Sequence, residues 1–150
     1  MARVPRIEAL PPDGIYHVTT RGVARQPIVV DEFDCRRFVA LLHGAQRQHD
    51  WQLLAYCLLP NHFHLVVLST LERLSDGMHS LNFRFAQRFN ERHDRVGHLF
   101  QGRFGARVVE GDEHFANVAE YVLDNAVGAG LCATREEWPW LGGELVADLR

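Results

Sequence analysis

The chain has 150 residues, of which 47 % are hydrophobic and 23 % are charged, and its formal net charge is −3. This composition is ordinary for a globular domain and argues against an intrinsically disordered chain. No run approaches the roughly 18 apolar residues of a membrane span, and the first residues contain no apolar segment typical of a signal peptide. We therefore expect one domain over residues 1–150, located in the cytoplasm and without membrane contact.

Charge is distributed unevenly along the chain. Residues 84–107 contain six arginines and two acidic residues, whereas the residues after Arg107 contain two arginines and nine acidic residues. We expect a basic centre that contacts phosphates and an acidic tail over residues 132–150. All 16 basic residues are arginine, which suits bidentate phosphate contacts, but codon bias in a GC-rich genome explains this choice equally well.

The three cysteines, Cys35, Cys57 and Cys132, are odd in number and show no Cys-x-x-Cys spacing. This pattern favours neither a disulfide framework nor a thiolate zinc site. We interpret them as reduced, structural thiols.

The first predicted element is a strand over residues 15–22, where apolar and β-branched residues alternate and Gly22 ends the run. A helix follows, because apolar residues recur at helical spacing to about Gln48. Either Asp31 or Asp34 is suited to cap its start.

Two strands come next, over residues 51–59 and 62–68. They are joined by Pro60 and Asn61 alone, and so short a connection predicts an antiparallel hairpin.

Helical spacing returns over residues 74–92, a further strand is predicted over residues 103–110, and Gly111 and Asp112 begin a last helix that runs to about Val127. The order β-α-β-β-α-β with an extra helix predicts an α+β fold, the ferredoxin-like split β-α-β sandwich around an antiparallel sheet. In that plan the first and third strands are central and the second and fourth lie at the edges. Two helices cover one face, and the last helix is the candidate to meet the other.

Two pairs of polar residues stand out on these elements. His62 and His64 are two apart on a strand and therefore point to the same face. Tyr121 and Asn125 are four apart on the last helix and share one side of it. Two imidazoles and an amide oxygen suit Mn²⁺ or Mg²⁺, and a nearby tyrosine is then placed as a nucleophile. Each feature alone also has an ordinary explanation: an incidental histidine pair, a half-buried tyrosine, or an asparagine near a helix end.

Four segments together carry a family resemblance: YHVTTRGVARQPI (16–28), PNHFHLVV (60–67), GHLFQGRF (97–104) and YVLDNAVGAGL (121–131). They resemble, in order, the motifs of the single-tyrosine HUH transposases, closest to the branch associated with REP sequences. The similarity covers about residues 13–131. It implies that His62, His64 and Asn125 are metal ligands and that Tyr121 is the nucleophile.

The resemblance also implies a reaction and a partner. The expected reaction is cleavage and strand transfer of single-stranded DNA at hairpin-forming palindromes, through a 5′-phosphotyrosine and with Mg²⁺ or Mn²⁺. Relatives occur as monomers or as homodimers that exchange active-site helices, and both states stay open. The predicted DNA contacts are Arg21, Arg25, Arg84, Arg88, Gln101 and Arg103. The row Arg84, Arg88 and Arg92 is equally well explained as an ordinary solvated helix flank.

Departures from the family pattern follow the tyrosine, at Leu123-Asp124, Ala126 and Gly128. Together with the net acidity, they leave open a domesticated hairpin-binding protein without catalysis. A second alternative is a metal-dependent hydrolase that uses the histidine pair without a covalent step. Trp138 and Trp140, in the acidic tail, are expected to pack against the domain rather than stack on bases.

Overall fold

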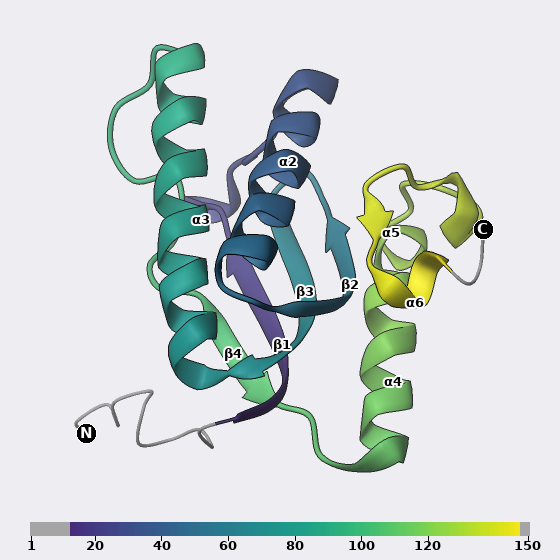
Figure 1. The fold of residues 1–150 in the computed structure, drawn as a ribbon. Coiled ribbons are helices and arrows are strands. Elements are labelled where there is room, and N and C mark those ends of the chain that lie inside the picture. Colours follow the sequence, from purple (N-terminus) through teal and green to yellow (C-terminus); the bar gives the residue numbers. More distant parts are fainter. Residues whose placement is uncertain (1–12, 148–150) are drawn as a thin grey trace, which may run out of the picture.

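The computed structural model describes residues 13–147 and forms an α+β fold around one antiparallel sheet (Figure 1). The strand order is β4-β1-β3-β2-β5. The strands are β1 (Asp13–Arg21), β2 (Gln52–Leu58), β3 (His62–Thr70), β4 (Gly105–Val108) and β5 (Leu141–Gly142). The helices are α2 (Glu32–Gln48), α3 (Leu71–Arg92), α4 (Gly111–Leu123), α5 (Asn125–Gly128) and α6 (Glu144–Ala147), with 3-10 turns η1 (Val23–Arg25) and η2 (Arg135–Glu137).

The predicted α+β sandwich is confirmed, with β1 and β3 at the centre of the sheet. The expectation that the second strand lies at an edge was wrong, because β5 pairs with β2 at Tyr56 and Cys57. The β-hairpin predicted from the short Pro60-Asn61 connection is confirmed, since β2 and β3 pair antiparallel.

Strand β3 shows how the sheet separates two environments. Its residues Phe63, Leu65 and Val67 are buried in the core that α2 and α3 cover. The alternate residues point to the other face, where Val66 joins a smaller apolar cluster with Val122 and Ala126 from α4 and α5. The sheet therefore carries His62 and His64 on the face that α4 meets (Figure 1).

Two helix boundaries differ from the predicted ones. Helix α3 begins at Leu71 because the Thr70 hydroxyl accepts a hydrogen bond from the Arg73 amide at 3.2 Å and caps the first turn. The last predicted helix is interrupted at Asp124, so that Asn125 opens the short helix α5.

The tail packs on the domain instead of trailing from it. The Trp138 indole donates a hydrogen bond to the Leu58 carbonyl at 2.9 Å, and Trp140 packs against the main core, as expected for these residues. Gly142 lies so close to β2 that a Cβ atom there would approach the Tyr56 ring to 2.4 Å. A glycine is therefore needed at this position, and the end of the predicted tail, residues 148–150, lies outside the described residues.

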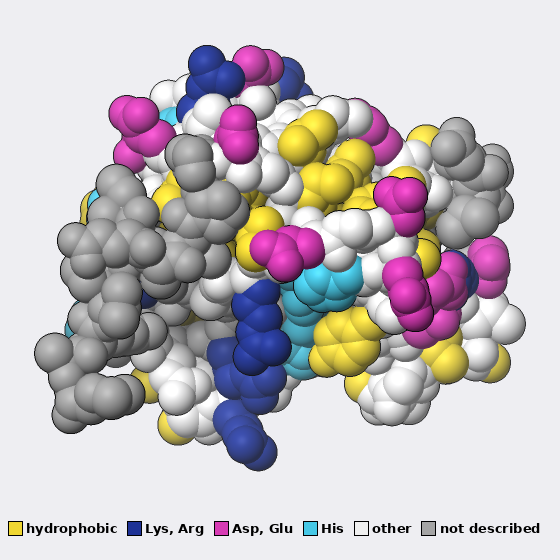
Figure 2. Space-filling view, turned by 90° about the horizontal axis from the view of Figure 1, so that it is seen from below, with side chains coloured by type: hydrophobic (Ala, Val, Ile, Leu, Met, Phe, Trp, Pro, Cys, Tyr) yellow, Lys and Arg dark blue, Asp and Glu magenta, His cyan; other side chains and the backbone are white. Residues whose placement is uncertain are grey.

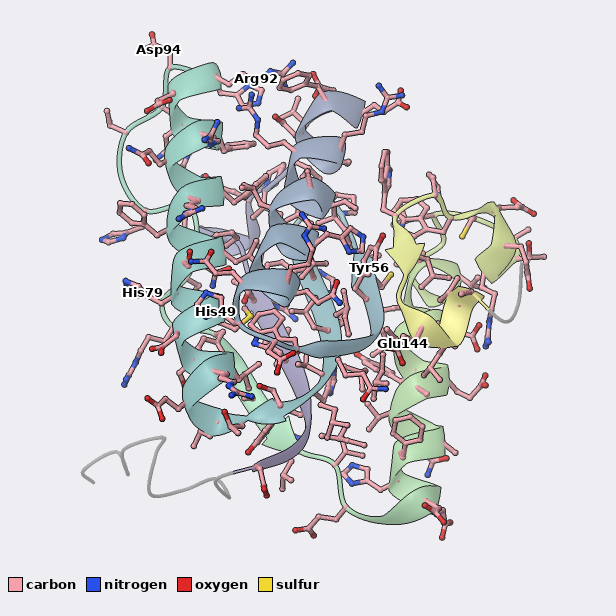
Figure 3. The ribbon with its side chains drawn as sticks, in the orientation of Figure 1. His49, Tyr56, His79, Arg92, Asp94 and Glu144 are labelled. Carbon is pink, nitrogen blue, oxygen red and sulfur yellow. The ribbon has the colours of Figure 1, made fainter. Side chains whose placement is uncertain are left out.

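Charged residues join the N-terminal end of α2 to the C-terminal end of α3. Arg92 donates to Asp31 at 2.7 Å and to Asp34 at 2.8 Å, and His93 lies 2.8 Å from Asp34 (Figure 3). Asp34 is 2 % exposed. Arg92 therefore belongs to the packing of the helices and not to a solvated arginine row.

Within residues 13–147, no helix is both long enough and apolar enough to cross a membrane. The expectation about a signal peptide concerns residues 1–12, which lie outside the described part of the chain.

Candidate active site

The two histidines of β3 lie side by side on the face toward α4, with ring centroids 5.0 Å apart. His64 is 4 % exposed, and His62 is partly buried. Burial, the neighbouring His17 and His62, and Arg21 lower the pKa of His64 to about 3. Burial and then Arg21 also lower the pKa of His62. Both rings are therefore neutral at physiological pH, the form that binds metals.

The two ring nitrogens of His64 have different surroundings. Nδ1 lies 3.0 Å from His17 Nε2 and 3.3 Å from the Thr19 hydroxyl. Nε2 is buried and has no hydrogen-bond partner among the described residues. If Nδ1 carries the proton and donates a hydrogen bond to His17, Nε2 of His64 holds a free lone pair.

His62 is oriented by the residue before it. Its Nδ1 lies 2.7 Å from Asn61 Oδ1, and because an amide oxygen only accepts hydrogen bonds, Nδ1 carries the proton. The Nε2 lone pair of His62 is left available in the same way as that of His64.

Tyr121 projects from α4 beside this histidine pair. Its ring centroid lies 5.5 Å from that of His64 and 6.1 Å from that of His17, in edge-on geometry. Its side chain is 56 % exposed, which is unusual for a large ring in contact with the sheet. The hydroxyl is thus accessible to a macromolecular substrate while the ring stays next to the histidines.

Asn125 lies one helical turn after Tyr121, at the start of α5. The two residues line a shallow hollow of about 640 Å³ whose lining comes from residues 117–129 and includes neither His62 nor His64. No set of three His, Cys, Asp or Glu side chains within residues 13–147 is arranged to hold a metal ion. A metal centre at His62 and His64 would therefore need the amide of Asn125 or an oxygen of the substrate to complete its ligands.

Asp124, an acidic residue that departs from the family pattern, is bound to an arginine of the tail. Its carboxylate accepts a hydrogen bond from Arg135 Nε at 2.8 Å, and Arg135 also donates to Glu120 at 2.5 Å. The Arg135 side chain is 18 % exposed. The tail thus holds the side of α4 that flanks Tyr121, and Asp124 is paired with an arginine.

His17 is the member of this site that the sequence did not reveal. It lies on β1, and the register that pairs Thr19 with His64 brings the two imidazoles together across the strands. Burial, with Arg107 and His114 nearby, lowers its pKa. His17 is two residues before Thr19 and therefore shares a strand face with it, which the sequence alone indicates. Only the pairing register of β1 with β3 shows that this face brings His17 to His64.

Three of the predicted DNA contacts lie next to the site. Arg21 is exposed at the end of β1 and pairs in register with His62. The backbone N–H of Gln101 donates to the Arg21 carbonyl at 2.9 Å, which brings these two residues together. Arg25 is exposed in the turn η1 that follows. In the face shown in Figure 2, arginine side chains lie directly beside histidines, and acidic side chains lie next to this group as well as farther to the right.

The other three predicted contacts are not gathered there. Arg84 and Arg88 are exposed on α3, in the layer on the far side of the sheet from Tyr121. Arg103 lines a groove along α3. The structure therefore separates the six residues into a group near the histidines and a group on the α3 side.

An antiparallel sheet with two helices on one face and a tyrosine-bearing helix beside paired histidines on the other defines a tyrosine-transposase architecture. A REP-associated tyrosine transposase, solved bound to a REP hairpin, has this fold: it matches with a TM-score of 0.74 at 15 % identity, over 94 % of this chain and 82 % of that chain. A protein from Deinococcus radiodurans R1 assigned as a transposase matches with a TM-score of 0.54 at 18 % identity, over 81 % of this chain and 95 % of that chain.

The family itself is shown by sequence. The model of the IS200-like transposases matches residues 12–125, and the chain belongs to this family of DNA-transposition enzymes. That range includes the paired histidines, Tyr121 and Asn125. No curated protein matches the sequence.

Proposed function

We propose that this protein cleaves and rejoins single-stranded DNA at hairpin-forming repeats through a covalent bond between the DNA and Tyr121. The observation that carries the proposal is the position of Tyr121, whose ring lies 5.5 Å from that of His64 while its side chain stays 56 % exposed. An exposed phenol next to neutral imidazoles suits attack on a phosphodiester from outside the domain. We place the reaction in the cytoplasm.

The donor set fits a divalent cation, Mg²⁺ or Mn²⁺. His64 Nε2 is a buried nitrogen that lacks a partner among the described residues, and the proton of His62 is held on Nδ1 by Asn61. Together with the Asn125 amide, these atoms would supply a mixed nitrogen and oxygen set with open positions. When bound, such a cation polarises a non-bridging phosphate oxygen and neutralises the charge that develops on it.

The proposed cleavage and rejoining at Tyr121 need no external energy source, because each phosphoester bond that breaks is replaced by one that forms. The Tyr121 oxygen forms a bond to phosphorus and loses its proton, while the bond from phosphorus to the 3′ oxygen breaks and that oxygen becomes a 3′-OH. The product is a 5′-phosphotyrosine. A second 3′-OH attacks the same phosphorus and releases Tyr121, so the number of phosphoester bonds is conserved.

Arginines near the histidines supply the affinity for DNA in this proposal. Arg21, Arg25 and Gln101 lie beside the site, and their phosphate contacts would weaken as salt rises. The similar transposase was solved with a REP hairpin, which supports a hairpin as the substrate of this chain too. Arg84, Arg88 and Arg103 would contact a part of the DNA farther from the cleaved bond. The protein acts as a monomer or as a homodimer.

The test uses single-stranded DNA from the flanks of the gene, labelled at either end and incubated with Mg²⁺ or Mn²⁺. We expect a denaturation-resistant adduct that carries only the 3′-end label, because the protein is joined to the 5′ phosphate of the downstream fragment. The adduct disappears in Tyr121→Phe. It persists in Tyr56→Phe, the matched control, because Tyr56 is 7 % exposed and packs in the main core.

Two outcomes would contradict the proposal. Hairpin binding without any adduct would favour the domesticated binding protein. Cleavage that survives in Tyr121→Phe without an adduct would favour the metal-dependent hydrolase.

A further inference from the structure

The helix that carries Tyr121 has an unfavourable charge for a protein that binds DNA. Residues 111–128, which include α4 and α5, contain four acidic residues and no arginine or lysine. Two of these acids flank the tyrosine, because Glu120 directly precedes it and Asp124 follows it by nearly one helical turn. A phosphodiester is negatively charged, so unpaired carboxylates at these two positions would repel it from Tyr121.

The two carboxylates belong to the same surface as the tyrosine. Glu120, Tyr121 and Asp124 line one shallow hollow, and no basic residue within residues 13–147 contributes to its lining. The side chains of Glu120 and Asp124 are 63 % and 50 % exposed. DNA that reaches the Tyr121 hydroxyl therefore meets a surface that both acids share.

One arginine of the tail pairs with both acids. Arg135 Nη2 lies 2.5 Å from a carboxylate oxygen of Glu120 and 2.7 Å from one of Asp124, and Arg135 Nε donates to Asp124 at 2.8 Å. No other basic side chain within residues 13–147 forms an ion pair with either acid. The hydrogen bond to Glu120 raises the pKa of Arg135, so the guanidinium stays charged. The three side chains together carry a formal charge of −1, whereas the two carboxylates alone carry −2.

The tail holds Arg135 in place. The backbone N–H of Trp138 donates to the Arg135 carbonyl at 3.2 Å and closes the turn η2. The Trp138 indole donates to the Leu58 carbonyl of β2 at 2.9 Å. The Arg135 side chain is only 18 % exposed. The guanidinium is therefore positioned against α4 before any DNA binds.

A role in stability alone explains this arrangement less well. Ion pairs to largely exposed carboxylates contribute little to the stability of a fold. Val122 and Leu123 already attach α4 to the sheet through apolar contacts. The position of the paired acids on either side of Tyr121 points instead to an electrostatic role.

We propose that Arg135 neutralises the carboxylates of Glu120 and Asp124 and so allows a DNA phosphate to approach Tyr121. The inference rests on the proposed function, which makes DNA the polyanion that must reach this tyrosine. Arg135 acts through its two partners and does not itself contact the reacting phosphate. The tail thus supplies a positive charge that α4 and α5 lack.

The test compares initial rates of Tyr121 adduct formation by the full chain, with the hairpin from the gene's flanks at low salt. Arg135→Gln is expected to lower this rate about fivefold, because two uncompensated carboxylates then face the incoming phosphate. Arg135→Lys keeps the charge and should retain most of the rate. Arg36→Gln is the matched control, since it also removes one positive charge and its ion pair with Glu32 lies on α2.

A rescue variant separates this electrostatic role from a purely structural one. Added to Arg135→Gln, the changes Glu120→Gln and Asp124→Asn remove both carboxylates and should restore the original rate. They do not restore the ion pairs between the tail and α4. A triple variant that stays as slow as Arg135→Gln would overturn the inference, and so would an Arg135→Gln chain that reacts as fast as the original.

Binding measured in the Tyr121→Phe background separates the inference from the proposed function. Fluorescence anisotropy gives Kd for the labelled hairpin without a covalent step. If the original chain forms no adduct, the proposed function fails and Kd decides the inference. A Kd that rises about fivefold in Arg135→Gln and falls again in the triple variant supports it, and an unchanged Kd overturns it. If the adduct forms and Arg135→Gln does not slow it, the inference alone fails.

Discussion

His17, which is not among the predicted metal ligands, is connected to the candidate site by a hydrogen bond with His64. A histidine that binds a metal through one ring nitrogen usually uses the other in a hydrogen bond that fixes its orientation and tautomer. His17 Nε2 lies 3.0 Å from His64 Nδ1, and Thr19 adds a second contact at 3.3 Å. We therefore predict that His17 positions the lone pair on His64 Nε2.

Replacing His17 with leucine should therefore weaken Mn²⁺ binding about 10- to 100-fold, because the His64 ring loses the group that orients it. His17→Gln keeps a hydrogen-bond acceptor and should recover most of the affinity. Calorimetric titration of the folded variants with Mn²⁺ measures this. His43→Leu serves as the control, since His43 lies on α2. Unchanged Mn²⁺ affinity in His17→Leu would show that the contact has no such role.

At the scale of elements, ion pairs join the N-terminal end of α2 to the C-terminal end of α3, in a helix layer that is otherwise apolar. The hydrogen bond from Arg92 holds the pKa of Asp31 down at about 2. Asp34 is buried and depends on Arg92, His93 and the Val30 amide for its partners. Removing one partner of a buried carboxylate leaves a charge that water cannot reach.

We expect Arg92→Leu to lower the free energy of unfolding by about 2 kcal/mol, because Asp34 stays buried with fewer donors. Arg88→Leu, one turn earlier, should change stability by less than about 0.5 kcal/mol, because Arg88 is exposed and makes no ion pair within residues 13–147. Urea denaturation of the two variants measures the difference. Equal stabilities would contradict a structural role for Arg92.

The long elements could be predicted from the sequence because the apolar residues of each one recur with the period of a strand or of a helix. Alternation over residues 62–68 and helical spacing over residues 74–92 reflect the core face of β3 and of α3. The two-residue strand β5 has no such period. It depends on Gly142 fitting against Tyr56, a contact between residues 86 positions apart in the chain that no local pattern encodes. The ion pairs of Arg92 could not be predicted for the same reason, since only the packing of α2 on α3 brings Asp31 and Asp34 to Arg92.

One part of the candidate site, the histidine pair, could likewise be predicted from the sequence, whereas its neighbours could not. His62 and His64 share a strand face by spacing alone, and their common face is what the structure shows. Their proximity to Tyr121 depends on α4 crossing the sheet, and that to His17 depends on the register of β1 with β3. Their roles as ligands, and that of Tyr121 as nucleophile, stay predictions.

At the scale of the whole molecule, a single chain brings the tyrosine to its own histidines. Helix α4 packs on β2 and β3 of the same chain through Val122 and Leu123. Arg135 ties the outer side of that helix to the tail through Glu120 and Asp124. We expect this packing to oppose an exchange of helices between protomers.

Mixing Tyr121→Phe with His64→Ala should accordingly give no covalent DNA adduct, because neither chain holds a complete site. The measurement is the denaturing-gel assay at several protein concentrations, with the unmodified chain as the positive control. If the mixture regains the adduct, the tyrosine of one chain acts at the histidines of another, and the packing seen here is not the active arrangement.

The pairing of β5 with β2 also affects how the protein behaves in concentrated solution. A bare strand edge presents unpaired backbone groups that another chain can extend into a continuous intermolecular sheet. Here one edge ends in the two residues of β5 and the other in the four of β4, and short edges of this kind are poor templates. We therefore expect the segment that carries β5 to hinder aggregation, because a chain cut after residue 131 would leave Tyr56 and Cys57 of β2 without their β5 partners.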